Sequence, residues 1–242
     1  MAQTVFKRYE IKYILTQAQK KALQSALIPY MQPDKHGPST IRNIYFDTPN
    51  YRLIRHCIEK PVYKEKLRLR CYQLADRQTP IFVELKKKFD GVVYKRRLVL
   101  PESQAMTWVN TGIHPGIDSQ ISREIDYFIH FYETLKPAVF LSYHREAFYS
   151  KTDPQFRITF DDDILFRQQD LTLTADTGGI PILSEGLVLM EIKTSGAIPL
   201  WLTDFLTANK LYKTSFSKYG TAYTTVIHAQ KKGDVPHVGN TI

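Results

Sequence analysis

The sequence lacks the features that mark membrane-spanning, secreted and disulfide-bonded proteins. Its 242 residues include two cysteines, Cys57 and Cys71, which are too few for a disulfide framework or a zinc site. The N-terminal stretch 1–17 has no apolar h-region, and no uncharged apolar run approaches the ~18 residues that cross a bilayer. We therefore expect a cytoplasmic protein with reduced, packed thiols and no membrane segment in this chain.

Negative charge is scarce in one part of the chain. Lys and Arg number 33 against 24 Asp and Glu, which gives a net charge of +9. Between Lys60 and Arg97, twelve basic residues stand against four acidic ones, so this segment alone carries +8. A positive field concentrated in one region indicates an anionic partner such as nucleic acid, a phosphate compound or a membrane surface.

Period-2 alternation and runs of β-branched and aromatic residues predict eight strands. Turn signals such as Asp90-Gly91 and Asp153-Pro154 separate some of them, and connections this short imply antiparallel neighbours. The predicted strands span residues 5–15, 41–47, 62–73, 80–88, 92–100, 138–149, 155–165 and 187–193.

Helical patterns lie between and after the strands. Thr16 and Gln19 form a capping box before one helix, and apolar residues at helical spacing over 121–132 predict a second. Pro199 begins a third helix, and the segment from Ser217 predicts a weaker fourth. We therefore expect strands and helices in one chain, an α+β fold.

No internal repeat or low-complexity linker divides the chain. Hydrophobic residues make up 43% and charged residues 24% of it, an ordinary globular composition. The simplest division is one domain over residues 1–230, followed by a disordered tail over 231–242.

Five of the predicted strands place charged side chains on one face and apolar side chains on the other. The clearest case is 62–73, where Lys64, Lys66, Arg68 and Arg70 occupy every second position. An antiparallel sheet with one face in water is the simple alternative, but such faces usually mix both charge signs with Thr, Ser and Gln. A closed eight-stranded antiparallel β-barrel with a basic lumen and helices packed outside fits the pattern better. Cations crowded inside such a barrel require an anion.

A series of motifs along the chain carries a family resemblance. In order they are "YEIKY", "KLRLRCY", "VELKKK", "GVVYKRR", "SYHREAF", "RITFDDDI", "MEIK" and "FSKYG". Together they resemble the catalytic domain of the vacuolar transporter chaperone (VTC) family, which makes polyphosphate and belongs to the triphosphate tunnel metalloenzyme, or CYTH, superfamily. The resemblance covers about residues 5–225.

The resemblance implies an antiparallel tunnel that holds a triphosphate or polyphosphate, with Mn²⁺ or Mg²⁺ on an inward glutamate, Glu191. Among Lys95, Arg96 and Arg97, the strand pattern does not choose which one points inward. The implied phosphate-binding residues are Lys12, Arg68, Arg70, Lys86, Lys95, Tyr143, Arg145, Arg157, Lys193, Ser217 and Lys218. Those expected to act in catalysis are Arg68, Arg70, Lys86, Arg145 and Arg157.

Several assignments have a structural alternative. Glu191 could form a salt bridge with Lys193 or Arg157 instead of binding a metal. The run Asp161–Asp163 is expected to be a solvated strand end, because consecutive residues alternate faces, with Asp161 the one candidate for a second acid. Ser217 precedes a helix whose backbone N–H groups would favour phosphate, but it could serve as a cap alone.

The resemblance implies an ATP-dependent polyphosphate polymerase. ATP would place its triphosphate in the tunnel, and the terminal oxygen of orthophosphate or of a growing polyphosphate would attack the γ-phosphorus in line, without a side-chain nucleophile. The eukaryotic members of the family also carry a phosphate-sensing domain and membrane helices. This chain resembles a stand-alone, bacterial-type version, and its membrane partner is unknown.

Two other functions are alternatives. The hydrolases of the superfamily begin with a Glu-x-Glu-x-Lys strand, whereas Arg8 replaces the first glutamate here and Glu10 and Lys12 remain. One acid fewer disfavours a two-metal triphosphatase acting on ATP, thiamine triphosphate or inorganic triphosphate, which is the first alternative. A non-enzymatic polyanion or nucleic-acid binder ranks lower, because the cationic faces lack the interleaved aromatic residues on which bases stack. We therefore expect no nucleic-acid partner.

Overall fold

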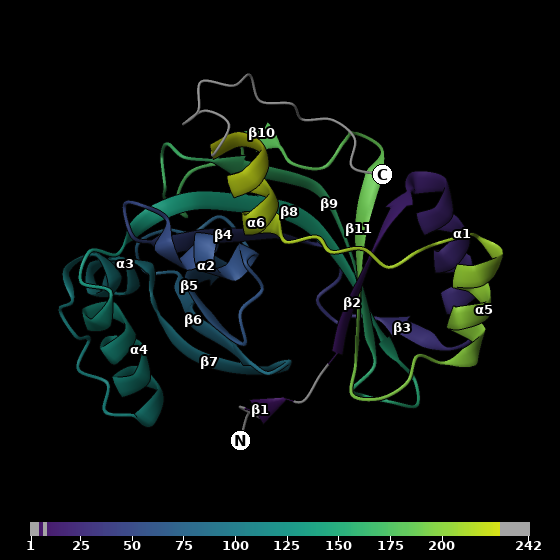
Figure 1. The fold of residues 1–242 in the computed structure, drawn as a ribbon, viewed down its shortest axis with the longest axis horizontal. Coiled ribbons are helices and arrows are strands. Elements are labelled where there is room, and N and C mark those ends of the chain that lie inside the picture. The colour runs from purple at the N-terminus through teal and green to yellow at the C-terminus, as the bar shows by residue number, and fades with distance from the viewer. Residues whose placement is uncertain (1–4, 7–8, 228–242) are drawn as a thin grey trace.

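The computed structural model describes residues 5–6 and 9–227, which form one large antiparallel sheet with helices on both of its faces (Figure 1). The α+β prediction and all eight predicted strand segments are confirmed, although the first segment is divided into β1 and β2. Two short strands, β3 and β10, add to them. The strands are β1 (Val5–Phe6), β2 (Tyr9–Thr16), β3 (Met31–Pro33), β4 (Ser39–Asp47), β5 (Tyr63–Cys71), β6 (Pro80–Phe89), β7 (Val92–Pro101), β8 (Lys136–Ser150), β9 (Arg157–Arg167), β10 (Ile180–Pro181) and β11 (Leu187–Thr194).

The strands follow one path through the sheet, in the order β1, β7, β6, β5, β4, β8, β9, β11, β2, with β3 paired to β8 and β10 to β9. Every ladder on the path is antiparallel. The predicted turn at Asp90-Gly91 joins β6 to β7, and both of its residues have positive φ angles, 42° and 80°. These angles match the tight hairpin turn that Asp-Gly favours.

The expected closed eight-stranded barrel is wrong. The sheet curls, but its two long end strands, β7 and β2, do not pair with each other (Figure 1). The edge of β7 is taken by Val5–Phe6 of β1. The edge of β2 that does not pair with β11 is contacted by Thr214, whose backbone N–H donates a hydrogen bond to the carbonyl of Lys12 at 2.7 Å. Because both edges have other partners, the ladder that would close the barrel is missing from the described strands.

Four helices cover the outer face of the sheet. The apolar sides of α1 (Gln17–Leu27) and α5 (Leu200–Ala208) pack over β2, β9 and β11 through a buried cluster that includes Leu23 and Leu202. At the other side of the molecule (Figure 1), α3 (Glu102–Thr111) and α4 (Gln120–Phe131) bury another cluster over β5 to β8. These two cores hold the curl of the sheet from outside. Three of the four helices, α1, α4 and α5, were predicted, whereas α3 was not.

Other helices lie against the inner face, so the expectation that all helices pack outside is wrong. The elements are α2 (Arg52–Ile58), α6 (Lys218–Ala222) and a π-helical turn (Tyr223–Ile227). Their apolar side chains share a buried cluster with Leu141 and Leu189. Because side chains two residues apart share a face of a strand, this cluster adjoins the face that carries the ionic residues.

A buried carboxylate fixes α2 and joins it to α6. Asp47 is 1% exposed and accepts the backbone N–H groups of Leu53 at 2.8 Å and Ile54 at 3.0 Å. It also accepts the phenolic OH of Tyr219 at 2.9 Å. Burial raises the pKa of Asp47, although these hydrogen bonds oppose the effect. The negative charge of the carboxylate favours the N-terminus of α2.

The four predicted helices form, with the capping box of Thr16 and Gln19 in place before α1. The fourth begins as predicted after Ser217, whose Oγ accepts the N–H of Gly220 at 3.2 Å. The predicted tail over 231–242 lies outside the described residues. Within the part of the chain that the structure describes, no helix combines the length and apolar character needed to cross a bilayer.

Candidate active site

The ionic faces of the strands come together on the concave side of the curl, here called the inner face. Lys12 on β2 lies opposite Glu191 on β11. From the far side of the sheet, the Nζ atom of Lys86 lies 3.8 Å from Glu10, so β6 and β2 face each other. The inner-face carboxylates are Glu10, Glu84, Asp161 and Glu191, and the cations include Lys12, Lys64, Lys66, Arg68, Arg70, Lys86, Lys88, Lys95, Arg97, Arg145, Arg157, Lys193 and Lys218.

Glu191 is the carboxylate with the most cationic neighbours at one end of this face. It is 6% exposed. Its Oε1 lies 3.4 Å from the Nζ atoms of both Lys12 and Lys218. Its Oε2 lies 3.3 Å from Arg145 and 3.4 Å from Lys193. Burial alone would raise the pKa of Glu191, but these four cations outweigh it and hold the pKa well below its ordinary value.

Asp161 lies beside Glu191 and is fully buried, so the expectation of a solvated strand end is wrong for this residue. The Arg145 guanidinium donates to both of its carboxylate oxygens at 2.6 Å, and Lys218 donates to one of them. Burial opposes the charged form, yet Arg145 and Lys218 lower the pKa of Asp161. We call Asp161, Glu191 and their four cationic neighbours the Glu191 centre.

A second cluster, the Glu84 centre, consists of Glu84 and four surrounding cations. Glu84 is 1% exposed. Its Oε2 accepts from Arg68 at 2.7 Å, and its Oε1 lies 2.6 Å from the Nζ of Lys95. Arg97 donates at 2.7 Å, while the Nε of Arg70 lies 4.0 Å away. Burial would raise the pKa of Glu84, but the four cations hold it well below its usual range.

One tyrosine links the two centres. The OH of Tyr143 accepts a hydrogen bond from Arg70 at 3.0 Å. The Tyr143 ring lies beneath Lys218, whose Nζ is 4.4 Å from the ring centroid, and beside Arg145, at 5.1 Å. Four of the predicted phosphate-binding residues contact Glu191 or Asp161, three contact Glu84, and Tyr143 itself lies between the two centres. The structure therefore brings most of the predicted set onto one continuous surface.

The remaining predicted residues are placed less centrally. Arg157 is on the inner face of β9, but its closest carboxylate is Asp34, at 3.6 Å. The side chain of Lys86 is 44% exposed and contacts Glu10 alone among the described carboxylates. Ser217 uses its Oγ to cap α6, as its structural alternative proposes, and lies next to Lys218 in the chain.

The structure also decides between adjacent basic residues on β7. Lys95 and Arg97 both reach Glu84 on the inner face. Arg96 points to the opposite face, where its Nε lies 3.0 Å from Glu124 on α4. The predicted Lys95 is therefore inward, and Arg97 is an inward cation that the resemblance left out.

Lys66 is another inner-face cation that is missing from the phosphate-binding residues implied by the resemblance. None of the described carboxylates lies within 4 Å of its Nζ, which is 5.8 Å from the centroid of the Tyr219 ring. Burial first, and then Lys86 and Lys12, lower the pKa of Lys66. The signal was present in the sequence, because Lys66 belongs to the row at every second position of 62–73.

The implied divalent cation can be tested against the donor atoms. Among the described residues, no group of three or more His, Cys, Asp and Glu side chains is arranged to hold a metal ion. Glu191 and Asp161 are close enough to share Arg145 and Lys218. Mg²⁺ is commonly bound by one or two carboxylates together with phosphate oxygens and water, and Mn²⁺ accepts the same hard ligands. The residues thus fit a cation that shares its coordination with a phosphate chain.

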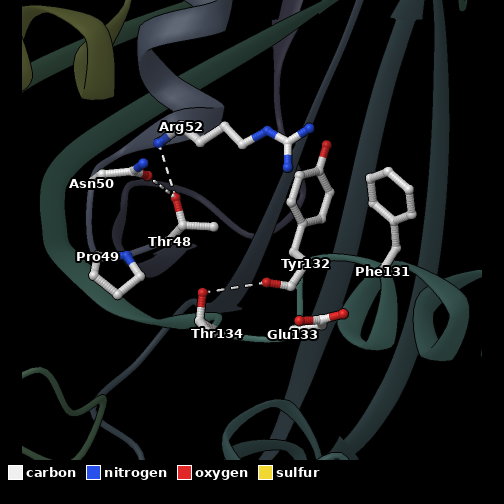
Figure 2. Close-up of a pocket in the computed structure, with 8 residues that line it drawn as sticks. All are labelled: Thr48, Pro49, Asn50, Arg52, Phe131, Tyr132, Glu133 and Thr134. Atoms are coloured by element: carbon white, nitrogen blue, oxygen red, sulfur yellow. Dashed lines mark hydrogen bonds between the residues drawn. The ribbon is translucent and has the colours of Figure 1, made fainter.

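A pocket of about 510 Å³ lies away from both centres, between the start of α2 and the end of α4 (Figure 2). Arg52 and Tyr132 project into it, and the Arg52 guanidinium carbon is 5.4 Å from the centroid of the Tyr132 ring. The OH of Tyr132 donates to Glu65, which is on the other face of β5 from Lys66. No predicted site residue lines this pocket.

Solved structures share this fold. A "putative adenylate cyclase" of Bacillus halodurans superposes with a TM-score of 0.53 at 15% identity, over 88% of this chain and 96% of that one. A "putative adenylate cyclase" of Vibrio parahaemolyticus has a TM-score of 0.48 at 11% identity, over 93% and 100% of the two chains. At these identities the likeness concerns the fold alone. No curated protein matches the sequence.

The family follows from the sequence itself. The family model described as the VTC domain matches residues 7–227, which is nearly all of the described chain. The chain belongs to the VTC domain family, and the resemblance seen in its motifs is confirmed.

Proposed function

We infer that the protein is an ATP-dependent polyphosphate polymerase whose substrates lie along the inner face. The observation that carries this proposal is the unbalanced charge there, because the cations far outnumber Glu10, Glu84, Asp161 and Glu191. Lys66 has no carboxylate within 4 Å among the described residues, so this inner-face cation has no ion-pair partner among them. A linear polyanion that follows the strands would neutralise it.

The reaction needs reactants in line and neutralised oxygens more than it needs a side-chain nucleophile. A terminal oxygen of orthophosphate or polyphosphate attacks the γ-phosphorus of ATP, the bond from that phosphorus to the β–γ bridging oxygen breaks, and ADP leaves. Arg145 and Lys218 at one centre, and Arg68 at the other, would hold the oxygens on which charge develops. Arg forks orient phosphate oxygens, whereas Lys side chains act as point charges.

A divalent cation held by Glu191 would neutralise further charge on the transferring phosphoryl group. The four cations around Glu191 keep its carboxylate ionised, so it is ready to bind a metal without losing a proton. Tyr143 places Arg70 of the Glu84 centre beside the cations of the Glu191 centre. The two centres could then hold donor and acceptor phosphates side by side.

The test is polymer synthesis by the purified protein. ATP with Mn²⁺ or Mg²⁺ should give long polyphosphate on a gel, and Glu191→Ala and Arg68→Ala should each reduce it at least tenfold. Arg96→Ala is the matched control, because Arg96 pairs with Glu124 on the outer face. Equal polymer from all four proteins would refute the assignment of the site.

A triphosphatase is the second candidate, favoured by one specific observation. Asp161 is fully buried on the inner face beside Glu191 and so supplies a second acid there, although the sequence has Arg8 in place of the first glutamate of the Glu-x-Glu-x-Lys strand. Two carboxylates could support hydrolysis with more than one metal ion. ADP and orthophosphate as the only products from ATP would favour this candidate over the polymerase.

A further inference from the structure

The described residues contain four buried side-chain atoms that have no hydrogen-bond partner. They are the Nε of Arg42, the Oγ of Ser142, the Nε of Arg157 and the Oγ1 of Thr159. Arg42 and Ser142 lie opposite each other on β4 and β8. Arg157 and Thr159 are two residues apart on β9 and therefore share one face. The unpaired atoms thus form two pairs, one on each face of the sheet.

The β9 pair lies on the inner face, within the ionic surface. Thr159 is fully buried and is opposite Glu191 on β11 and Ala147 on β8. On its own strand it lies between Arg157 and Asp161. Its hydroxyl is therefore flanked by charged side chains, yet it bonds to none of them in the described structure.

The charged neighbours of Thr159 on this face already have other partners. Asp161 accepts from Arg145 and Lys218. Arg157 turns its Nη2 towards Asp34, at 3.6 Å, which leaves its Nε unused. A buried hydroxyl without a partner is unfavourable, and Val has nearly the same shape without that penalty. A threonine here is explained if its donor is used when something else is bound.

We propose that the Oγ1 of Thr159 donates a hydrogen bond to an oxygen of the bound phosphate chain, beside the Nε of Arg157. The proposal deepens the proposed function and rests on it. Lys193, opposite Arg157, supplies the charge for the same phosphate group. Thr159 then acts by binding and positioning a phosphate group, because a neutral hydroxyl adds direction without adding to the repulsion among the cations.

The outer pair provides a control of the same chemical kind. Ser142 is 1% exposed and its Oγ is also unpaired, but it lies on the face opposite Tyr143 and Arg145. Removing either hydroxyl deletes one buried, unpaired polar group. Only the change at Thr159 removes a donor from the inner face.

The experiment measures binding of inorganic tripolyphosphate by titration calorimetry and unfolding of the ligand-free protein by heat. Hydrogen bonds to charged groups contribute about 1.5–3 kcal/mol, so Thr159→Val should weaken binding roughly tenfold to hundredfold. Thr159→Ser should restore most of the affinity, and Ser142→Ala should leave it unchanged. In the ligand-free protein, both Thr159→Val and Ser142→Ala should unfold at the wild-type temperature or above it.

The outcomes separate this proposal from the function on which it rests. Tripolyphosphate that fails to bind the wild type would count against the proposed function itself. Binding to the wild type and equally tight binding to Thr159→Val would overturn the role of the hydroxyl and leave the function standing. A lower unfolding temperature for ligand-free Thr159→Val would also overturn it, because the hydroxyl would then have a partner before any phosphate arrives.

Discussion

Replacing Glu84 by Gln should destabilise the free protein and strengthen its binding of polyphosphate. The change keeps the shape of the side chain but removes the charge that holds Arg68 at 2.7 Å, Lys95 at 2.6 Å and Arg97 at 2.7 Å. Removing one partner of a buried ion pair costs about 3–5 kcal/mol, because the other charges stay buried and uncompensated. Since small proteins are stable by only about 5–15 kcal/mol in total, the effect should be large.

Urea unfolding followed by tryptophan fluorescence measures the change, since Trp108 is fully buried. With a slope of about 2 kcal/mol per molar urea, a loss of this size lowers the midpoint by roughly 2 M. Tripolyphosphate should then raise the midpoint of Glu84→Gln more than that of the wild type. In the wild type, phosphate must compete with the Glu84 carboxylate for its cations, whereas in the variant these cations are free to bind it.

The matched control is Glu124→Gln. Glu124 contacts Arg96 at 3.0 Å and Lys87 at 3.7 Å on the outer face, and its side chain is 23% exposed. A partly exposed pair of this kind is worth about 0–1 kcal/mol. Two results would refute the idea that the Glu84 carboxylate occupies cations that otherwise bind phosphate. One is that Glu84→Gln unfolds at the same urea concentration as Glu124→Gln, and the other is that tripolyphosphate raises its midpoint no more than that of the wild type.

Three further predictions concern protonation and packing. Burial lowers the pKa of Lys95 to about 7 and of Lys193 to about 8, so the affinity for tripolyphosphate should fall between pH 7 and 9 as these two side chains lose their protons. In calorimetry, the double variant Lys95→Arg, Lys193→Arg should bind tripolyphosphate equally tightly across that range. Lys86 above all lowers the pKa of Glu10 from 4.5 to about 2, so this stabilisation is complete above pH 4.5 and is lost on acidification towards pH 2. Acid unfolding of Glu10→Gln should accordingly be less steep than that of the wild type, and an unchanged curve would contradict this. Tyr219→Phe removes the hydroxyl that donates to Asp47, the buried carboxylate at the start of α2, and should lower the free energy of unfolding by about 1.5–3 kcal/mol. Urea unfolding measures this change, and an unchanged free energy would count against that contact.

The faces of the strands could be predicted because side-chain alternation is a local property. A period of two places Arg68 with Arg70, and Arg157 with Asp161, on one face wherever the strand lies in the sheet. Turn residues such as Asp90-Gly91 are equally local. The family resemblance then converted a list of inward cations into a candidate site.

Local patterns could not predict whether the sheet closes into a barrel, or which roles the carboxylates have, because both depend on residues that are distant in the sequence. β2 pairs with β11 from the other end of the chain, and no local pattern announces that Thr214 meets the edge of β2 at Lys12. Asp161 looked like one of three solvated acids because its burial is created by Arg145 and Lys218, from two other elements. Helix α2 was missed because its N-cap, Tyr51, makes no side-chain cap and has a left-handed φ of 59°.

The contact between Lys12, near the start of the chain, and residues 214–216, near its end, has a consequence for synthesis on the ribosome. Lys12 belongs to the second strand made, yet its carbonyl is bonded by Thr214, and its Nζ donates to the carbonyl of Phe216 at 2.6 Å. Lys218 follows two residues later. A growing polypeptide released before this stretch emerges would leave the border of β2 open to pairing with other molecules. Such a fragment would also lack one of the positive charges beside Glu191, so the inner face is complete only after residues 214–218 have been made.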